Sequence, residues 1–132
     1  MEKLLNLDYN MKEQAPGGLE LAFMGDAVYE VLTREWLLSS ASMRVGDLNQ
    51  KKIDLVNNRA QYHAVEKISP YLTEEELAVF KRGRNATNGH IPKNAERMHY
   101  NYATGLETLF GFLYLNGDLE RMRQLFLLIV NE

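Results

Sequence analysis

The chain contains no cysteine, and this absence excludes disulfide bonds and metal sites built on thiolates. Its apolar runs, of which residues 125–130 are an example, are far too short to span a bilayer. The first residues also lack the succession of basic, apolar and small residues that forms a signal peptide. We therefore expect a cytoplasmic protein that does not associate with a membrane.

Positive charge is also scarce, because the chain has 15 Lys and Arg against 18 Asp and Glu, a net charge of −3. This balance argues weakly against a nucleic-acid partner. The distribution of the charges argues for one, since residues 81–97 hold five basic residues and one acidic residue, which leaves +4 on this stretch and −7 on the rest. A basic stretch in an otherwise acidic chain is typical of a surface that contacts anions.

The hydrophobic pattern has helical periodicity and shows no strand-like alternation. Helices are expected at about residues 19–38, 48–68, 74–82, 95–115 and 119–129. Asp47 is the expected N-cap of the second helix, and Thr73 with Glu76 has the spacing of a capping box at the start of the third. Turn-forming residues between 83 and 94 predict a loop. With no internal repeat and no sign of a second domain, we expect residues 1–132 to form a single all-α bundle.

Asp26 lies at the margin of the apolar face of the first of these helices, directly after Gly25. A glycine inside a helix costs about 1 kcal/mol relative to alanine, so Gly25 indicates that another element approaches the backbone closely. The carboxylate is either a half-exposed group at this helix contact or a functional one. The pattern of this helix alone leaves both interpretations open.

Glu107 is the only charged residue between positions 103 and 115, a stretch that is apolar nearly all round and therefore expected to be buried. A buried carboxylate without a partner is neutralised, pairs with a cation or binds a metal ion. The small neighbours Ala103 and Gly111 leave space for a ligand. A structural ion pair, for example with Arg59, is the alternative.

Two helices that each present one carboxylate beside small residues suit Mg²⁺, which proteins commonly hold through one or two carboxylates, waters and substrate phosphates. The ion makes bound water more acidic and stabilises charge on a reacting phosphodiester. Asp26 and Glu107 are therefore the candidate catalytic residues and Mg²⁺ ligands of a nuclease. Candidate contacts to the phosphates of the nucleic acid are Lys81, Arg82, Arg84, Asn85, Lys93, Asn94 and Arg97.

Other patterns carry less weight. Glu96 and His99 match half of a di-iron site, but no second Glu-x-x-His occurs. His63 and His90 have no metal-ligand spacing between them. Tyr100 and Tyr102, near the basic stretch, are expected in the core rather than at the nucleic acid.

Residues 21–28, Leu-Ala-Phe-Met-Gly-Asp-Ala-Val, resemble the signature helix of ribonuclease III catalytic domains. Residues 106–111, Leu-Glu-Thr-Leu-Phe-Gly, resemble the second acidic helix of these domains. Residues 82–86, Arg-Gly-Arg-Asn-Ala, with Pro-Lys-Asn at 92–94, resemble mini-ribonuclease III, the short bacterial branch without a double-stranded-RNA-binding domain. The resemblance covers about residues 17–128, nearly the whole chain.

The chain differs from ordinary ribonuclease III at two positions of the site. Ordinary ribonuclease III has four acidic residues per site, and this chain has Ala22 and Thr104 at two of these positions. Mini-ribonuclease III is similarly reduced, so the departures agree with that branch. Glu20 is a poor substitute for the missing glutamate, since it lies about 160° around the helix from Ala22.

The resemblance implies a homodimeric, Mg²⁺-dependent endoribonuclease that cuts both strands of double-stranded RNA, with the precursor of 23S ribosomal RNA as the usual substrate of this branch. Trp36, Leu37 and Leu38 add support for a dimer, because they extend the apolar surface of the first helix. The alternatives are a non-catalytic RNA-binding relative associated with ribosomal RNA and a helical interaction protein. Retention of Asp26 and Glu107 favours catalysis.

Overall fold

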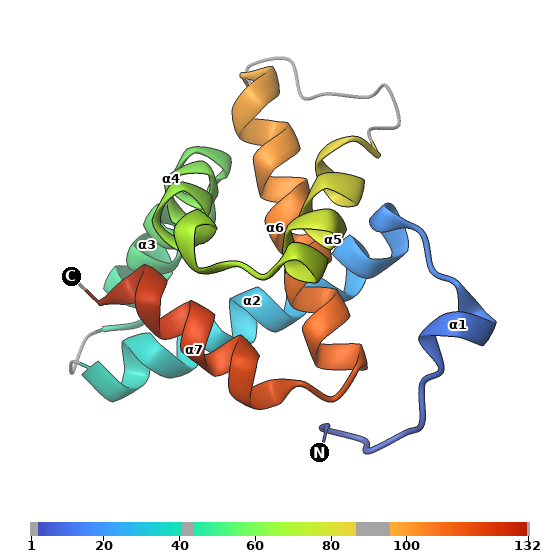
Figure 1. Ribbon diagram of the computed structural model, residues 1–132. Coiled ribbons are helices and arrows are strands. Elements are labelled where there is room, and N and C mark those ends of the chain that lie inside the picture. The colour runs from blue at the N-terminus through green and yellow to red at the C-terminus, as the bar shows by residue number, and fades with distance from the viewer. Residues whose placement is uncertain (1–2, 41–43, 87–95, 132) are drawn as a thin grey trace.

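The computed structural model describes residues 3–40, 44–86 and 96–131 (Figure 1). Within these ranges every regular element is a helix and no strand occurs, which confirms the all-α prediction. The helices are α1 (Met11–Gln14), α2 (Gly18–Ser40), α3 (Val45–Val56), α4 (Asn58–Ile68), the 3₁₀ helix η1 (Ser69–Tyr71), α5 (Glu74–Arg84), α6 (Arg97–Leu115) and α7 (Leu119–Val130). None of the described helices is long and apolar enough to cross a membrane.

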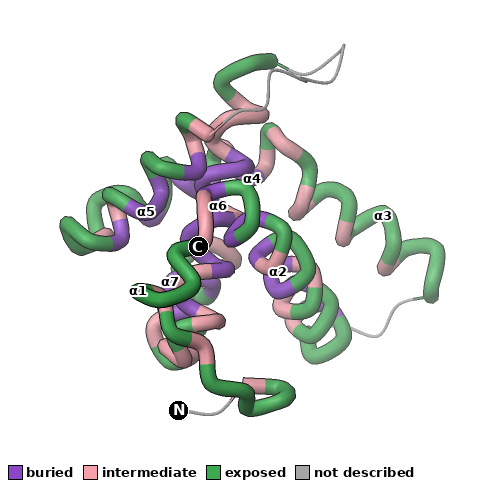
Figure 2. The backbone as a smooth tube through the Cα atoms, turned by 90° about the vertical axis from the view of Figure 1, so that its right-hand side faces the viewer, coloured by how far each residue is buried: buried purple, intermediate pink, exposed green. Residues whose placement is uncertain are grey.

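Helix α6 lies at the centre of the bundle, and α2, α4, α5 and α7 pack around it (Figure 1). Its residues Leu106, Leu109 and Phe110 have no exposed surface. Figure 2 shows the buried residues gathered on α6 and on the faces that neighbouring helices turn toward it, whereas α3 carries none. The burial expected for residues 103–115 is therefore confirmed, and its cause is the apolar surface on nearly every side of this helix.

Helices α2 and α6 cross in direct backbone contact at two glycines. A Cβ atom at Gly25 would overlap the carbonyl group of Glu107, and one at Gly111 would overlap the carbonyl oxygen of Leu21. The close approach predicted at Gly25 is thus confirmed. Because Asp26 directly follows Gly25, this crossing also brings Asp26 to the part of α6 that carries Glu107.

The helix expected over residues 48–68 is in fact two helices, and the prediction of one was wrong. The chain is extended at Asn57 (φ −67°, ψ 163°), whose side chain caps α4 by accepting a hydrogen bond of 2.8 Å from the N–H of Ala60. The predicted N-cap at Asp47 was also wrong, since Arg44 precedes α3 and Asp47 lies in the first turn of that helix. A carboxylate there still interacts favourably with the helix dipole.

The start of α5 is as predicted, with a reciprocal capping box. Thr73 Oγ1 accepts a hydrogen bond from the N–H of Glu76 (3.1 Å), and Glu76 Oε1 accepts one from the N–H of Thr73 (2.9 Å). Glu76 also binds Arg121 of α7, with Nε–Oε2 and Nη2–Oε1 distances of 2.8 and 2.9 Å. These hydrogen bonds from Arg121 lower the pKa of the Glu76 carboxyl group. Glu76 is therefore part of the scaffold.

The end of α5 differs from the prediction, because the helix continues through Gly83 to Arg84 instead of ending near residue 82. Gly83 is buried at the contact with α6, where a Cβ atom would overlap the side chain of Thr108. The hydroxyl of Thr108 in turn donates to the carbonyl oxygen of Gly18 at 2.9 Å. The glycine thus serves helix packing here and does not end the helix.

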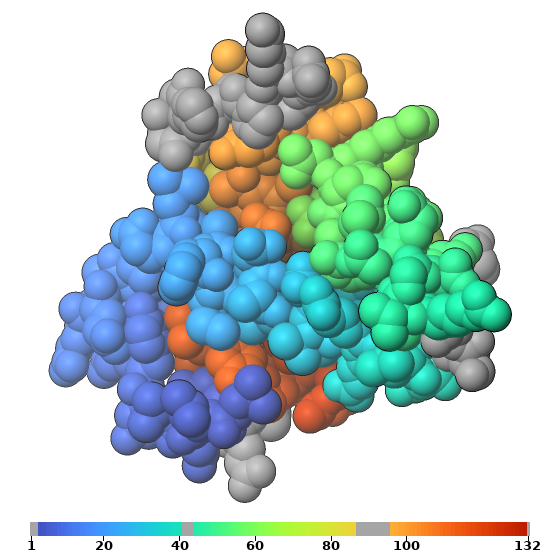
Figure 3. All heavy atoms as spheres, turned by 180° about the vertical axis from the view of Figure 1, so that it is seen from behind, coloured from blue at the N-terminus to red at the C-terminus, as the bar shows by residue number. Residues whose placement is uncertain are grey.

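The apolar surface of α2 also differs from the expectation. Leu37 is 3% exposed, and Trp36 packs against the core. Only Leu38 of the predicted apolar extension is exposed, at 68%. Figure 3 shows that α2 nevertheless lies open along one face of the molecule, between the N-terminal segment and α3. The exposed apolar residues of α2 are Leu19, Phe23, Val31 and Leu38.

Candidate active site

The side chains of Asp26 and Glu107 meet at the crossing of α2 and α6, where their carboxyl groups are joined by a hydrogen bond. Asp26 is exposed and Glu107 is partly buried. The two candidate residues, which lie far apart in the sequence, therefore form one site. Each is supplied by a helix that the glycine contact holds in place.

The protonation of this pair follows from its surroundings. Burial raises the pKa of Glu107 to about 8, and the negative charge of Asp26 and the hydrogen bond to it act in the same direction. At neutral pH Glu107 therefore keeps its proton and donates it to the Asp26 carboxylate. The pair then carries one negative charge and one shared proton. A cation bound by both carboxylates displaces that proton.

A third polar side chain reaches the pair from α4. Gln61 is 2% exposed, and its side-chain amide donates a hydrogen bond to the carboxyl group of Glu107, an interaction that lowers the pKa of Glu107. The expected alternative partner, Arg59, is exposed, so the residue that α4 presents to Glu107 is Gln61. Gln61 was not predicted from the sequence, because the pattern of residues 58–68 does not show that its amide contacts a carboxyl group on another helix.

Thr104, at one of the two departures, and Glu20, near the other, make local hydrogen bonds. Thr104 donates its hydroxyl to the carbonyl oxygen of Tyr100 within α6 (3.1 Å). Glu20 accepts a hydrogen bond of 3.3 Å from the N–H of Gly17 at the start of α2 and is exposed. In the described part of the chain, no three His, Asp or Glu side chains are grouped so as to hold a metal ion.

Asp26 and Glu107 nevertheless fit a Mg²⁺ ion. This ion commonly takes one or two protein carboxylates and fills its other positions with water and phosphate oxygens. The charge of Asp26 raises the pKa of Glu107, and a cation bound by both carboxylates would relieve this repulsion. A hollow of about 350 Å³ opens beside Asp26 and is lined by Phe23, Met24, Asp26, Ala27 and Glu30.

The basic candidates that the structure describes lie at one end of the molecule, where α5 ends and α6 begins (Figure 1). Arg82 donates to the carbonyl oxygen of Pro16 at 2.6 Å, and the guanidinium of Arg84 lies 6.0 Å from the centre of the Phe80 ring. The exposed members of the set are Lys81, Arg82, Asn85 and Arg97. Lys93 and Asn94 lie outside the described residues.

Tyr102, His99 and His63 have local partners. Tyr102 packs against Phe80 and Tyr62, with ring centres 5.4 and 4.9 Å away, as expected of a core residue. His99 lies 3.3 Å from Glu96 and His63 lies 2.9 Å from Glu66. His90 lies outside the described residues.

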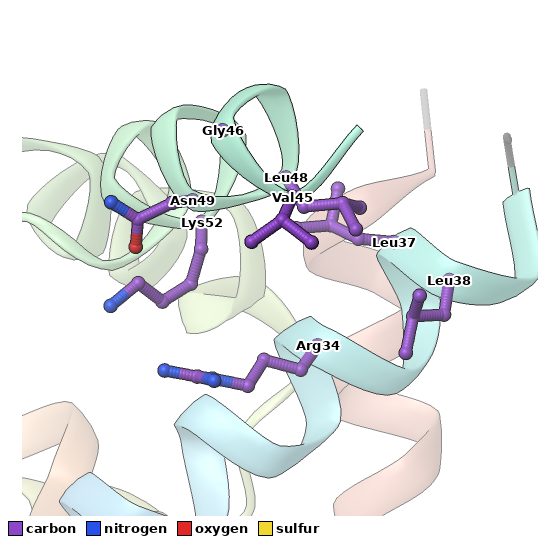
Figure 4. Close-up of a pocket in the computed structure, with 8 residues that line it drawn as sticks. All are labelled: Arg34, Leu37, Leu38, Val45, Gly46, Leu48, Asn49 and Lys52. Carbon is purple, nitrogen blue, oxygen red and sulfur yellow. The ribbon is translucent and has the colours of Figure 1, made fainter. Parts of the chain in front are cut away.

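A separate hollow of about 390 Å³ lies between α2 and α3 (Figure 4). Arg34 and Lys52 extend toward the same side of it and both pair with Glu30, at 3.0 and 3.5 Å. Neither Asp26 nor Glu107 lines this hollow. It is therefore distinct from the carboxylate site.

Comparison with known proteins agrees with this arrangement. The family model described as the ribonuclease III domain matches residues 19–118, most of the chain. The chain belongs to the ribonuclease III domain family.

The similar proteins within this family carry a narrower name. Mini-ribonuclease 3 of Clostridium tetani is 41% identical over 123 residues, which cover 92% of this chain and 80% of that protein. Mini-ribonuclease 3 of Brevibacillus brevis is 40% identical over 107 residues, 81% of this chain and 80% of the other. The resemblance to mini-ribonuclease III is thus confirmed.

A crystal structure of a Fusobacterium nucleatum protein has the same fold, with a TM-score of 0.80 and 32% identity over 88% of this chain and 94% of that one. Family membership makes the chain an endoribonuclease. This result counts against the two alternatives, a non-catalytic RNA-binding relative and a helical interaction protein.

Proposed function

We propose that residues 1–132 act as one catalytic domain, a Mg²⁺-dependent endoribonuclease that cleaves double-stranded RNA, with the precursor of 23S ribosomal RNA as its substrate. The observation that carries the proposal is the hydrogen-bonded pair of Asp26 and Glu107 at the crossing of α2 and α6. A pair of carboxyl groups that shares one proton is a site prepared for a divalent cation.

In the proposed mechanism Asp26 and Glu107 together hold Mg²⁺. When bound, the ion supplies a more acidic water and stabilises the negative charge that develops on the phosphodiester. Glu107 releases its shared proton when the site is loaded, and Asp26 presents its carboxylate from the exposed side of α2. Gly25 and Gly111 keep the two helices in backbone contact and so fix the separation of the carboxylates.

RNA binding is assigned to the basic end of the molecule. The exposed cations Lys81, Arg82 and Arg97 lie where α5 ends and α6 begins, and α6 is also the helix that carries Glu107. Phosphate contacts of this kind position a duplex without reading its sequence. Arg84, Asn85, Lys93 and Asn94 complete the proposed surface.

We further propose that the protein acts as a homodimer. A site with two carboxylates cleaves one strand, whereas a duplex presents two scissile phosphates, and a two-fold dimer places an identical site at each. The open face of α2 supports this assembly, since Phe23 and Val31 are 83% and 53% exposed (Figure 3). Exposed apolar side chains along one helix face are typical of a protein interface.

The proposed function is tested with a defined RNA duplex, the matching single strand, and a duplex that reproduces the stem of precursor 23S ribosomal RNA. Cleavage is expected for the duplexes only, with Mg²⁺ and not with EDTA, and faster for the ribosomal stem. Equal rates on the two duplexes would refute the ribosomal assignment alone. Unchanged cleavage in EDTA would refute the role of the metal ion.

A further inference from the structure

Gln61 has one satisfied and one unsatisfied polar atom at the carboxylate pair. Its side chain donates a hydrogen bond to Glu107, while its Oε1 is fully enclosed and has no donor among the residues that the structure describes.

Packing does not account for an amide at this position. The neighbours of Gln61 on the buried face of α4 are Ala64, Val65 and Ile68, all apolar. A methionine has similar volume and would fill the space without burying an unsatisfied oxygen. A buried acceptor without a donor destabilises the folded state, so its retention indicates a use for the amide group that carries it.

The position of the amide suggests that use. The amide contacts Glu107, which is a proposed ligand of the cation. Residues behind the ligands of a metal ion orient those ligands, and their loss typically weakens metal binding or activity about 10–100-fold.

We propose that Gln61 is a positioning residue of the site: its buried amide group holds the carboxyl group of Glu107 in the orientation that a bound cation requires. This inference rests on the proposed function, because it requires a divalent cation at Asp26 and Glu107. It adds a third helix, α4, to a site otherwise built from α2 and α6.

The test replaces Gln61 by Met and, separately, by Leu, which removes both polar atoms at nearly constant volume. The control is Gln50→Met, the same change at an exposed position on α3. Binding of Mn²⁺ to the RNA-free protein is measured by electron paramagnetic resonance. Duplex cleavage is measured as kcat and KM, and folding by thermal melting.

Gln61→Met is expected to melt at the same temperature as the unmutated protein or higher, since an unsatisfied oxygen is removed. Its Mn²⁺ affinity and kcat should fall about 10–100-fold with little change in KM, as for other residues that orient metal ligands. Gln50→Met should change none of these quantities. Should Gln61→Met fail to fold, Gln61→Leu provides the same comparison.

Affinity and kcat within about two-fold of the unmutated protein in a folded Gln61 variant would overturn the inference. The failure of the proposed function looks different, because Asp26→Asn and Glu107→Gln would then also bind Mn²⁺ normally. Weak Mn²⁺ binding in these two variants, with normal binding in Gln61→Met, refutes the role of Gln61 alone.

Discussion

The carbonyl group of Glu107 lies against Gly25 so closely that no side chain fits at position 25. Gly25→Ala therefore forces α2 and α6 apart at the site. Overpacking of this kind costs about 1–3 kcal/mol, and we expect a clear fall in melting temperature together with a loss of cleavage. Gly46→Ala is the matched control, because a Cβ atom there has no neighbour within 4 Å. A Gly25→Ala variant with normal stability and activity would contradict the packing described for this crossing.

Removal of either carboxylate should stop the chemistry while preserving the fold. We expect Asp26→Asn and Glu107→Gln each to reduce duplex cleavage by about 10²-fold or more, as when a group that stabilises the transition state is lost. Circular dichroism should show unchanged helix content. Glu20→Ala is the control, because Glu20 only accepts a hydrogen bond from Gly17 at the helix start. Near-normal cleavage by either carboxylate variant would refute the assignment.

Stability of the metal-free protein should depend on pH through Glu107. The folded-state pKa of about 8 lies above the ordinary value of 4.5, so the folded protein binds more protons than the unfolded chain between these limits. The stabilisation by the shared proton is complete below about pH 4.5 and is lost as the pH rises through about 8, by at most about 1.4 kcal/mol per pH unit. Urea denaturation in EDTA across this range measures the slope.

The matched variant for this experiment is Glu107→Gln, which cannot lose a proton. Its stability should fall less between pH 5 and 9, roughly by the share that Glu107 contributes. Asp26→Asn should also flatten the curve, because it removes a negative charge that raises the pKa of Glu107. Parallel curves for all three proteins would show that Glu107 titrates normally.

The proposed RNA-binding surface where α5 ends and α6 begins should make RNA binding depend on salt concentration. Replacing Arg82, Arg84 and Lys93 by Ala is expected to weaken binding and to reduce the slope of log K against log salt by roughly 0.9 per lost phosphate contact, as for duplex DNA. Binding is titrated in an Asp26→Asn background so that the RNA stays intact. Arg123→Ala on α7, where Arg123 pairs with Glu120 at 3.3 Å, is the control. An unchanged slope would mean that these charges are only solvated.

The dimer is tested at a residue of α2 that does not line the hollow beside Asp26. Val31→Arg should yield a monomer in sedimentation experiments, because it places a charge in the proposed apolar contact. Leu127→Arg on α7, where the leucine is 48% exposed, should leave the assembly unchanged. A heterodimer of one unmutated and one Asp26→Asn subunit should nick the duplex. Efficient cutting of both strands by a monomer would exclude the two-site arrangement.

Much of the fold and both carboxylates followed from the sequence, because apolar periodicity and the cost of burying a charge leave local signals. Gly25 predicted a close contact, and Glu107 predicted a site inside the bundle. The break at Asn57 did not follow, since the apolar pattern continues across it and the cap depends on one side-chain hydrogen bond. Trp36 and Leu37 were wrongly expected at the surface, because their burial depends on packing against other elements that the pattern of a single helix does not specify.

Gln61 shows the limit of such reasoning. Nothing within α4 distinguishes it from an ordinary amide, and its significance comes from Glu107 on another helix. A side chain that matters only through a contact between distant segments leaves no spacing or motif in one sequence. Its burial and its unsatisfied oxygen became visible only in the folded chain.

The contact between Gly25 and Glu107 also bears on when the protein becomes active during synthesis. Asp26 lies in the first quarter of the chain and Glu107 in the last, so the two carboxylates meet only after most of the polypeptide has been made. Contacts between such distant segments are formed late and with a large loss of chain entropy. A nascent chain that lacks α6 therefore cannot assemble the proposed nuclease site.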